Sequence, residues 1–203
     1  DNFYRDQHRL FRIIQRDGQT GLHDGFVSWG LAKQLREGTE TDWNVVRLSK
    51  WKYWMAASDV SFKEDIFFAD ENFFDVFNFP LAKGSREKAL QLKNSIVISK
   101  DLARKLFGNE DAVGKNIRVN TKMDFIVTGI LDEIPANTIF QINAMIPLQN
   151  VNDLFYSGAD SGWHDTGASV FIKAQNNDEN HITSLLNQIY EQHVPENNKE
   201  NLT

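Results

Sequence analysis

Few residues in this sequence have the types and spacing that chemistry requires. The five histidines form no HxH, HxxxH or HExxH pair, so the spacing of a metal site is missing; they are His8, His23, His164, His181 and His193. The pair His164–Asp165, with Asp160 nearby, is the best candidate for a metal or acid–base site. It falls in a polar loop, where simple solvation of such side chains is the more frequent explanation.

Other patterns of catalytic or cofactor sites are missing. The chain has no cysteine, which excludes disulfide frameworks, thiolate catalysis and cysteine-bound zinc. It has no glycine-rich phosphate loop, and the acidic Glu110-Asp111 between Gly108 and Gly114 would repel phosphate. The segment Gly158–Gly162 lacks the GxSxG spacing of a nucleophile elbow. We therefore predict no catalytic residue, no metal ligand, no bound cofactor and no enzymatic activity.

Aromatic residues are the most numerous candidates for a binding site. Six phenylalanines lie within thirteen positions and could line a ligand pocket, although a core is favoured; they are Phe67, Phe68, Phe73, Phe74, Phe77 and Phe79. Trp29, Trp51 and Trp54 could line a groove or anchor a partner, with a core role again favoured, less strongly for Trp54. The cluster Lys100, Arg104 and Lys105 is most simply the solvated outer face of a helix.

Composition narrows the class of protein. The 203 residues include 22 Lys and Arg against 28 Asp and Glu, for a net charge of −6, with 41% hydrophobic residues. These proportions are typical of a globular chain, and no basic stripe indicates a nucleic-acid partner. No apolar stretch approaches the length of a membrane helix. A start at Asp1 rather than Met predicts a processed protein or a domain of a longer chain.

Residues 2–16 predict a short helix that runs into a strand, Leu10–Ile14. A helix is then predicted from Ser28 to a left-handed cap at Gly38. Three strand candidates follow, with Ser58-Asp59 as a turn between the last two; they are Trp43–Ser49, Trp51–Ala57 and Val60–Phe68.

The middle and end of the chain have clearer signals. Strand Ser95–Ile98 leads into a helix, Lys100–Phe107, between Ser99 and Gly108, with an inner face of Leu102, Ala103, Leu106 and Phe107. A hairpin with Ile117 and Val119 inside returns over Phe125–Leu131. The last predicted elements are strand Gln141–Ile146, loop Ser157–Gly167, strand Ala168–Ala174 and helix Glu179–His193. Because strands and helices do not alternate strictly, we predict an α+β fold in two lobes.

One long block of sequence is more specific than any chemical motif. It runs from Phe68-Ala69-Asp70-Glu71-Asn72-Phe73-Phe74 to Pro80-Leu81, continues over Asn94–Gly108 and Glu110–Ile117, and ends with Asp124–Leu131. This block resembles the extracytoplasmic core domain of MacB-like and FtsX-like ABC-transporter permeases, in the short-loop form common in Bacteroidetes. The opening Phe3-Tyr4 through Ile14 is similar to the start of that domain after its first membrane helix.

The resemblance implies an organisation and a function. It implies a porter-like lobe built from both chain ends, residues 1–80 and 147–203, and a smaller inserted α/β lobe, residues 81–146. It implies an inner membrane protein whose periplasmic domain relays ATP-driven motion to a periplasmic substrate or partner. This role covers export, lipoprotein extraction and mechanotransmission.

The partners that the resemblance implies are a second permease copy, a cytoplasmic ABC ATPase reached through membrane helices, and a periplasmic adaptor protein as an optional third. It also implies that Asp1 and Thr203 lie at one end of the domain. The alternative hypothesis is a free-standing periplasmic ligand-binding protein that uses the phenylalanine cluster as its pocket.

Overall fold

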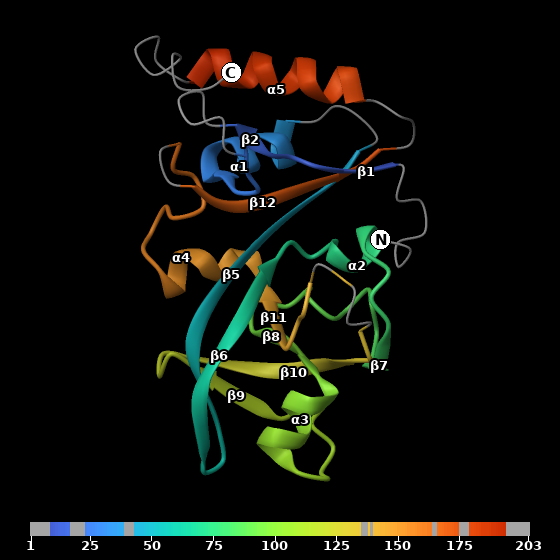
Figure 1. Ribbon diagram of the computed structural model, residues 1–203. Coiled ribbons are helices and arrows are strands. Elements are labelled where there is room, and N and C mark those ends of the chain that lie inside the picture. The colour runs from blue at the N-terminus through green and yellow to red at the C-terminus, as the bar shows by residue number, and fades with distance from the viewer. Residues whose placement is uncertain are drawn as a thin grey trace. The chain divides into compact units, whose positions relative to one another are not determined.

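The computed structural model describes residues 9–16, 23–38, 43–134, 138, 140–163, 166–174 and 179–193. The chain divides into two compact units, one formed by Leu48–Tyr156 and the other by the described residues on either side of it. Helices and strands are mixed in an α+β fold (Figure 1), as predicted. The lobe boundaries at 80/81 and 146/147 stay a prediction, and Asp1 and Thr203 lie outside the described residues.

The unit formed by the flanking segments is a small sheet with two helices. Strand β12 (Thr166–Lys173) pairs antiparallel with β1 (Leu10–Arg12) and with β4 (Val27–Ser28), and its next neighbour in the sheet is β5 (Asn44–Ala57). Helix α1 (Trp29–Gly38) packs on β12 and contacts helix α5 (Glu179–His193). Strands β2 (Gln15–Arg16) and β3 (His23–Asp24) form a separate pair.

Both helices of this unit follow their sequence signals. The Ser28 hydroxyl accepts a hydrogen bond from the Leu31 N–H at 3.3 Å, which is the predicted N-cap, and Ala32 and Leu35 are fully buried. The expected left-handed cap at Gly38 is wrong, because Gly38 is the last helical residue and its φ is not positive. Helix α5 has the predicted bounds and buries Ile182 and Ile189.

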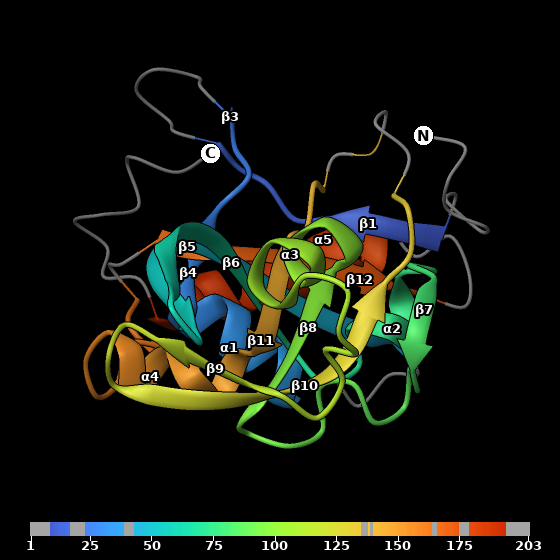
Figure 2. The ribbon, with the colours of Figure 1, turned by 90° about the horizontal axis from the view of Figure 1, so that it is seen from below.

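The strands of Leu48–Tyr156 close into a ring. Beyond β5, the ring contains β6 (Val60–Ala69), β11 (Ala144–Pro147), β8 (Ser95–Ser99), β10 (Met123–Leu131) and β9 (Asn116–Val119). Each of these pairs with the next, and β9 closes the ring by pairing with β5 at Met55 and Ala56. Strand β7 (Leu81–Gly84) adds to β10 outside the ring (Figure 2). A closed ring leaves few unpaired strand edges.

Two strands predicted on either side of Lys50 are in fact one. Strand β5 runs without interruption over Asn44–Ala57, because β6 pairs with it continuously from Val60 opposite Ala57 to Ala69 opposite Leu48. The predicted turn at Ser58-Asp59 is confirmed, with Ser58 at a φ of 50°.

The interior of the ring is apolar and one helix lies against its strands. Met55, Ile117, Val119 and Phe125 are completely buried. Helix α3 (Lys100–Phe107) has the predicted bounds, with the Ser99 hydroxyl accepting from the Leu102 N–H at 3.1 Å.

The capping and inner face of α3 agree only in part with prediction. Gly108 adopts a φ of 65° at the end of the helix, and Leu102 and Leu106 are buried. The expectation that Phe107 is buried is wrong: its side chain is only half-buried, with the Lys115 ammonium 5.0 Å from the ring centroid.

Several short elements escaped the sequence patterns. Helices α2 (Phe73–Val76), η2 (Leu148–Asn150) and α4 (Val151–Leu154) have too few residues to show helical periodicity. Strand β12 begins at Thr166, inside the predicted loop, and β1 ends at Arg12, before the predicted Ile14. The helix predicted before β1 falls mostly outside the described residues.

Candidate interaction surface

In the polar loop considered for a metal or acid–base site, the described residues include no cluster of side chains that could form such a site. Asp160 is half-buried, whereas His164 and Asp165 lie outside the described residues. Within the described ranges, no three His, Cys, Asp or Glu side chains come together as a metal site would require. The prediction of no catalytic, metal or cofactor residue therefore stays a prediction.

The phenylalanine cluster is core, as the sequence favoured. All six phenylalanines predicted for it are buried, and the rings of Phe73 and Phe77 lie 4.9 Å apart. Phe140, which the sequence did not single out, joins them with its centroid 5.5 Å from that of Phe77. Because the rings fill the space between one another, this cluster does not form the pocket that a ligand-binding protein would need.

The three tryptophans divide between core and surface. Trp29 is buried, but Trp51 is 38% exposed and Trp54 is 48% exposed, so the core expectation is wrong for both. Trp51 packs edge-on against Phe155, with centroids 4.3 Å apart, and its Nε1–H donates to the Ser49 hydroxyl at 2.6 Å. Alternation along one strand places Trp51 and Trp54 on opposite faces.

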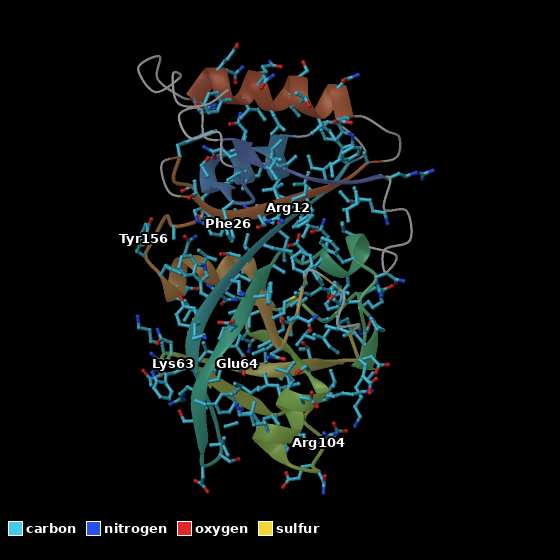
Figure 3. All side chains as sticks on the ribbon, viewed as in Figure 1. Arg12, Phe26, Lys63, Glu64, Arg104 and Tyr156 are labelled. Atoms are coloured by element: carbon cyan, nitrogen blue, oxygen red, sulfur yellow. The ribbon has the colours of Figure 1, made fainter. Side chains whose placement is uncertain are left out.

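The three cations predicted on the outer face of α3 are exposed, and each of them makes a contact. Lys100 forms an ion pair with Asp132, and this hydrogen bond raises the pKa of the Lys100 ammonium and lowers the pKa of the Asp132 carboxyl. Lys105 lies 3.3 Å above the centroid of the Phe62 ring of β6. The Arg104 guanidinium (Figure 3) lies 3.6 Å from the Asp101 carboxylate of the same helix.

The outside of β5 and β6 carries an unusual set of side chains. Lys50, Lys52 and Trp54 alternate along β5, and the antiparallel register places Asp65 opposite Lys52 and Lys63 opposite Trp54. Directly opposed residues share a face, so these five side chains lie on one surface. The inner face of the same strands carries Met55 and Ile66, which are fully buried.

Strands β9 and β10 extend this surface. Arg118 of β9 lies opposite Ala56 of β5 and opposite Asp124 of β10. We call the surface formed by these side chains the outer cationic face; it consists of Lys50, Lys52, Trp54, Lys63, Asp65, Arg118 and Asp124, all of them at least partly exposed.

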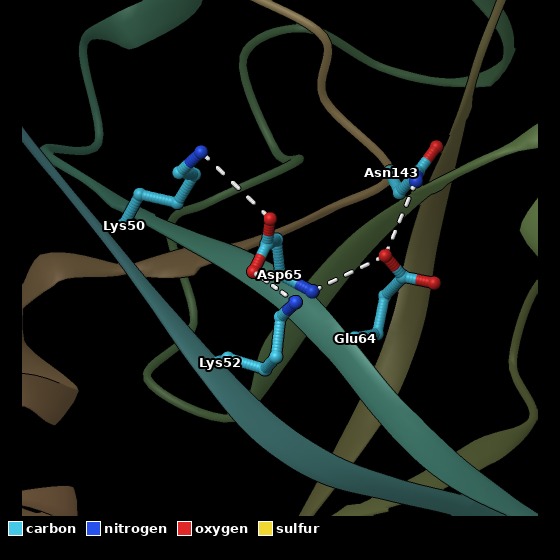
Figure 4. A network of polar contacts seen from close by, with 5 residues as sticks. All are labelled: Lys50, Lys52, Glu64, Asp65 and Asn143. Carbon is cyan, nitrogen blue, oxygen red and sulfur yellow. Dashed lines mark hydrogen bonds and ion pairs between the residues drawn. The ribbon is translucent and has the colours of Figure 1, made fainter.

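Ion pairs on the outer cationic face differ in their distances and in the number of hydrogen bonds. Arg118 holds Asp124 through two hydrogen bonds of 2.7 Å and 2.6 Å, and this pairing lowers the pKa of the Asp124 carboxyl. Lys50 and Lys52 share the single carboxylate of Asp65, each at 3.7 Å (Figure 4). Those distances exceed a normal hydrogen bond, so Asp65 neutralises two lysines only weakly.

Lys63 has a different partner. Its ammonium lies 5.6 Å from the centroid of Trp54, a cation–π contact, and no described carboxylate lies within ion-pair distance of it. Its neighbour Glu64 belongs to the opposite face, where its side chain accepts a hydrogen bond from Asn143 at 3.2 Å (Figure 4). The sequence contained the signal for this surface, the alternation Lys50-x-Lys52-x-Trp54 within a strand, but the break predicted near Lys50 concealed it.

A second surface feature belongs to the other unit. A small cavity between α1 and α5 is lined by Gln34, Gly38, Leu185, Gln188, Ile189 and Gln192. These amides and aliphatic groups carry no charge and no nucleophile, so the cavity shows no chemistry of its own.

Comparison with known proteins identifies the family. Residues 2–188 match the family described as MacB-like periplasmic core domain. The chain belongs to this family. No helix in the described part of this MacB-like domain is long and apolar enough to cross a membrane. Family members are periplasmic domains of ABC-transporter permeases, so the predicted recognition is confirmed and the domain is extracytoplasmic.

Solved structures share the fold of this MacB-like domain at low identity. A domain assigned to a permease protein from Porphyromonas gingivalis superposes with a TM-score of 0.75 at 21% identity, covering 98% of this chain and 92% of that one. The periplasmic region of MacB from Actinobacillus actinomycetemcomitans gives 0.67 at 18% identity, covering 91% and 84%.

The extracellular domain of the noncanonic ABC-type transporter YknZ from Gram-positive bacteria gives 0.64 at 16% identity, covering 90% and 95%. Among proteins with curated descriptions, none matches the sequence significantly.

Proposed function

We propose that this domain relays ATP-driven motion from the inner membrane to a periplasmic substrate or partner, and performs no catalysis itself. In this proposal both chain ends continue into membrane helices. The permease forms a dimer with a second copy, and a cytoplasmic ABC ATPase supplies the energy. A periplasmic adaptor protein is an optional further partner.

The path of the chain is the observation that carries this proposal. The unit Leu48–Tyr156 is inserted between two segments that together form the other unit. Force applied at the two chain ends would enter the unit built from the flanking segments, and would reach Leu48–Tyr156 through the connections at residues 47–48 and 156–157. The extracytoplasmic ring of strands would then be the part that the substrate or partner meets.

A distance measurement between the two copies tests this relay. Because the domain has no cysteine, Glu87→Cys introduces a single exposed spin-label site into Leu48–Tyr156 in each copy of a permease without other cysteines. Glu191→Cys does the same for the other unit. In the full-length permease reconstituted with its ATPase, we expect both label-to-label distance distributions to shift between the nucleotide-free and ATP-bound states.

The control is an ATPase variant that does not bind ATP, in which both distributions should stay in the nucleotide-free state. Identical distributions with and without ATP at both positions would contradict the relay. Loss of all dipolar coupling between labels would contradict the proposed dimer.

A further inference from the structure

The outer cationic face has more positive charge than its own carboxylates neutralise. It presents Lys50, Lys52, Lys63 and Arg118 against Asp65 and Asp124, in a chain whose net charge is −6. Arg118 and Asp124 satisfy each other, which leaves three lysines and the one shared Asp65. Concentrated cations on an acidic protein indicate a surface that complements an anionic partner.

Trp54 lies among these lysines and is nearly half exposed. Tryptophan is enriched among the residues that dominate protein–protein binding, because its large ring buries much apolar area against a partner. Lys63 contacts the Trp54 ring and holds one side of it, so the indole is partly ordered before any partner arrives. Trp54 therefore has the properties of an apolar anchor surrounded by charge.

The spacing of the lysines suggests the form of the partner. Lys50, Lys52 and Trp54 are each separated by two residues of extended chain, which is about 6.6–6.8 Å. Carboxylates at alternate positions of an extended segment have the same repeat, whereas a helix repeats its faces every three to four residues. An extended acidic segment can therefore meet successive lysines while an apolar residue of the same segment covers Trp54.

We propose that the outer cationic face docks an extended acidic segment of another extracytoplasmic protein, with Trp54 as the apolar anchor. This inference uses the family assignment, which places the face outside the cytoplasm, and it goes beyond the proposed relay of motion. Its chemical content is a protein segment with carboxylates at alternate positions around an apolar side chain. Anionic lipid headgroups and a second copy of this chain are the competing occupants that the experiment must separate.

Site-specific photo-crosslinking in intact cells tests the docking. Ser61 lies on the same face, opposite Ala56 and next to the Trp54–Lys63 pair, and is exposed. With p-benzoyl-phenylalanine at position 61 of the full-length permease, we expect one protein adduct whose crosslinked peptide, read by mass spectrometry, is acidic at alternate positions. Lys63→Glu should reduce the adduct about fivefold, near the upper limit for one exposed ion pair.

Matched variants sharpen the measurement. Lys88→Glu makes the same charge change at an exposed lysine outside the face and should leave the adduct unchanged. Trp54→Ala should reduce it about tenfold or more, as expected for an anchor. If the partner's crosslinked carboxylates are replaced by positively charged side chains, the adduct should form again in the Lys63→Glu variant.

Four results would overturn the proposal: an adduct with a second copy of this chain, an adduct with lipid alone, no adduct, or a protein adduct that Lys63→Glu leaves unchanged. The unfolding midpoint of the purified Lys63→Glu domain shows that the variant is folded. The spin-label distances in the same variant separate the two proposals, because loss of docking should leave the ATP-dependent shift intact.

Discussion

Two stretches of the same strand face behave in opposite ways. Lys63, Asp65 and Phe67 alternate along the outer side of β6, yet Lys63 is exposed and Phe67 is buried. At Phe67 a second layer of phenylalanine rings covers the strand, with the Phe140 centroid 6.1 Å away. Among the described residues, Lys63 contacts one aromatic ring, that of Trp54, which is itself 48% exposed.

The difference shows that aromatic content alone does not separate core from surface. Both stretches carry aromatic side chains on extended, alternating strands. What differs is the covering layer. Phe140 packs on Phe67 and in turn contacts Phe77 and Phe79, whereas charged side chains surround the other stretch. Burial of apolar area stabilises the first, and exposed apolar area is left available for a partner in the second.

The largest expected effect comes from removing a ring on the covered side. Phe77 is fully buried and contacts Phe73, Phe79 and Phe140, so Phe77→Ala should lower the free energy of unfolding by about 3–5 kcal/mol. Trp54→Ala should lower it by less than about 1 kcal/mol, because a half-exposed ring with one cation–π contact creates no cavity. Urea unfolding of the purified domain measures both, and equal losses would remove the distinction.

A mutation of Arg86 should have an intermediate effect on the free energy of unfolding, and it shows whether the aromatic rings alone stabilise the region around Phe77. The Arg86 guanidinium donates to the backbone carbonyls of Phe74, Phe77 and Phe79 and to the Asn78 side-chain oxygen, and it stacks 5.9 Å from the Phe74 ring. Arg86→Ala removes all four of these hydrogen bonds and should lower the free energy of unfolding by about 1–3 kcal/mol.

Lysine keeps the charge at this position but not the planar fork of donors, so Arg86→Lys should recover only part of the loss. Full recovery in the same urea experiment would mean that charge, rather than the pattern of donors, matters at this position.

The smallest expected effect belongs to the ion pairs of the exposed side. The hydrogen bonds from Arg118 and from Lys100 lower the pKa values of Asp124 and Asp132 below the ordinary 3.8. A carboxyl whose pKa is lower in the folded state stabilises the fold above the unfolded pKa, and this contribution disappears as the pH falls through the folded pKa.

The urea midpoint should therefore be level from about pH 7 to about pH 5 and fall below about pH 4. Because both carboxyls are exposed, the contribution of Asp124 is small, and Asp124→Asn should make the acid-side fall only slightly shallower. A steeper fall in Asp124→Asn than in the unchanged domain would contradict the assigned direction of the pKa shift.

Sequence patterns correctly predicted those elements whose ends are set by residues nearby in the sequence. Ser99 and Gly108 delimit α3 because a side-chain cap and a left-handed glycine act within one turn of helix. The turn at Ser58 and the N-cap at Ser28 were predictable for the same reason, and the helical spacing of apolar residues from Ile182 to Tyr190 predicted α5. Family membership was also predictable, because it rests on a long ordered block of sequence rather than on any contact.

The predictions that proved wrong concern residues whose burial or pairing depends on segments far away in the sequence. Phe107 lies on the apolar side of α3 by periodicity, yet Leu102 and Leu106 are the residues that the sheet covers. Trp51 and Trp54 were expected in the core because large aromatic side chains are most often buried, but both remain partly exposed on the two faces of β5. The polar residues near Lys50 suggested that one strand ends there and another begins, although pairing with β6 keeps β5 continuous.

Local propensity and the order of residues along the chain were therefore enough to predict the class of fold, the N-caps of α1 and α3, the buried phenylalanine cluster and the family. They could not predict that β9 closes the ring onto β5, or that Lys50, Lys52, Lys63 and Arg118 gather on one face around Trp54. Strand register between segments far apart in the chain set both arrangements. Such a register is decided by which side chains pack across the sheet, and no single segment contains that information.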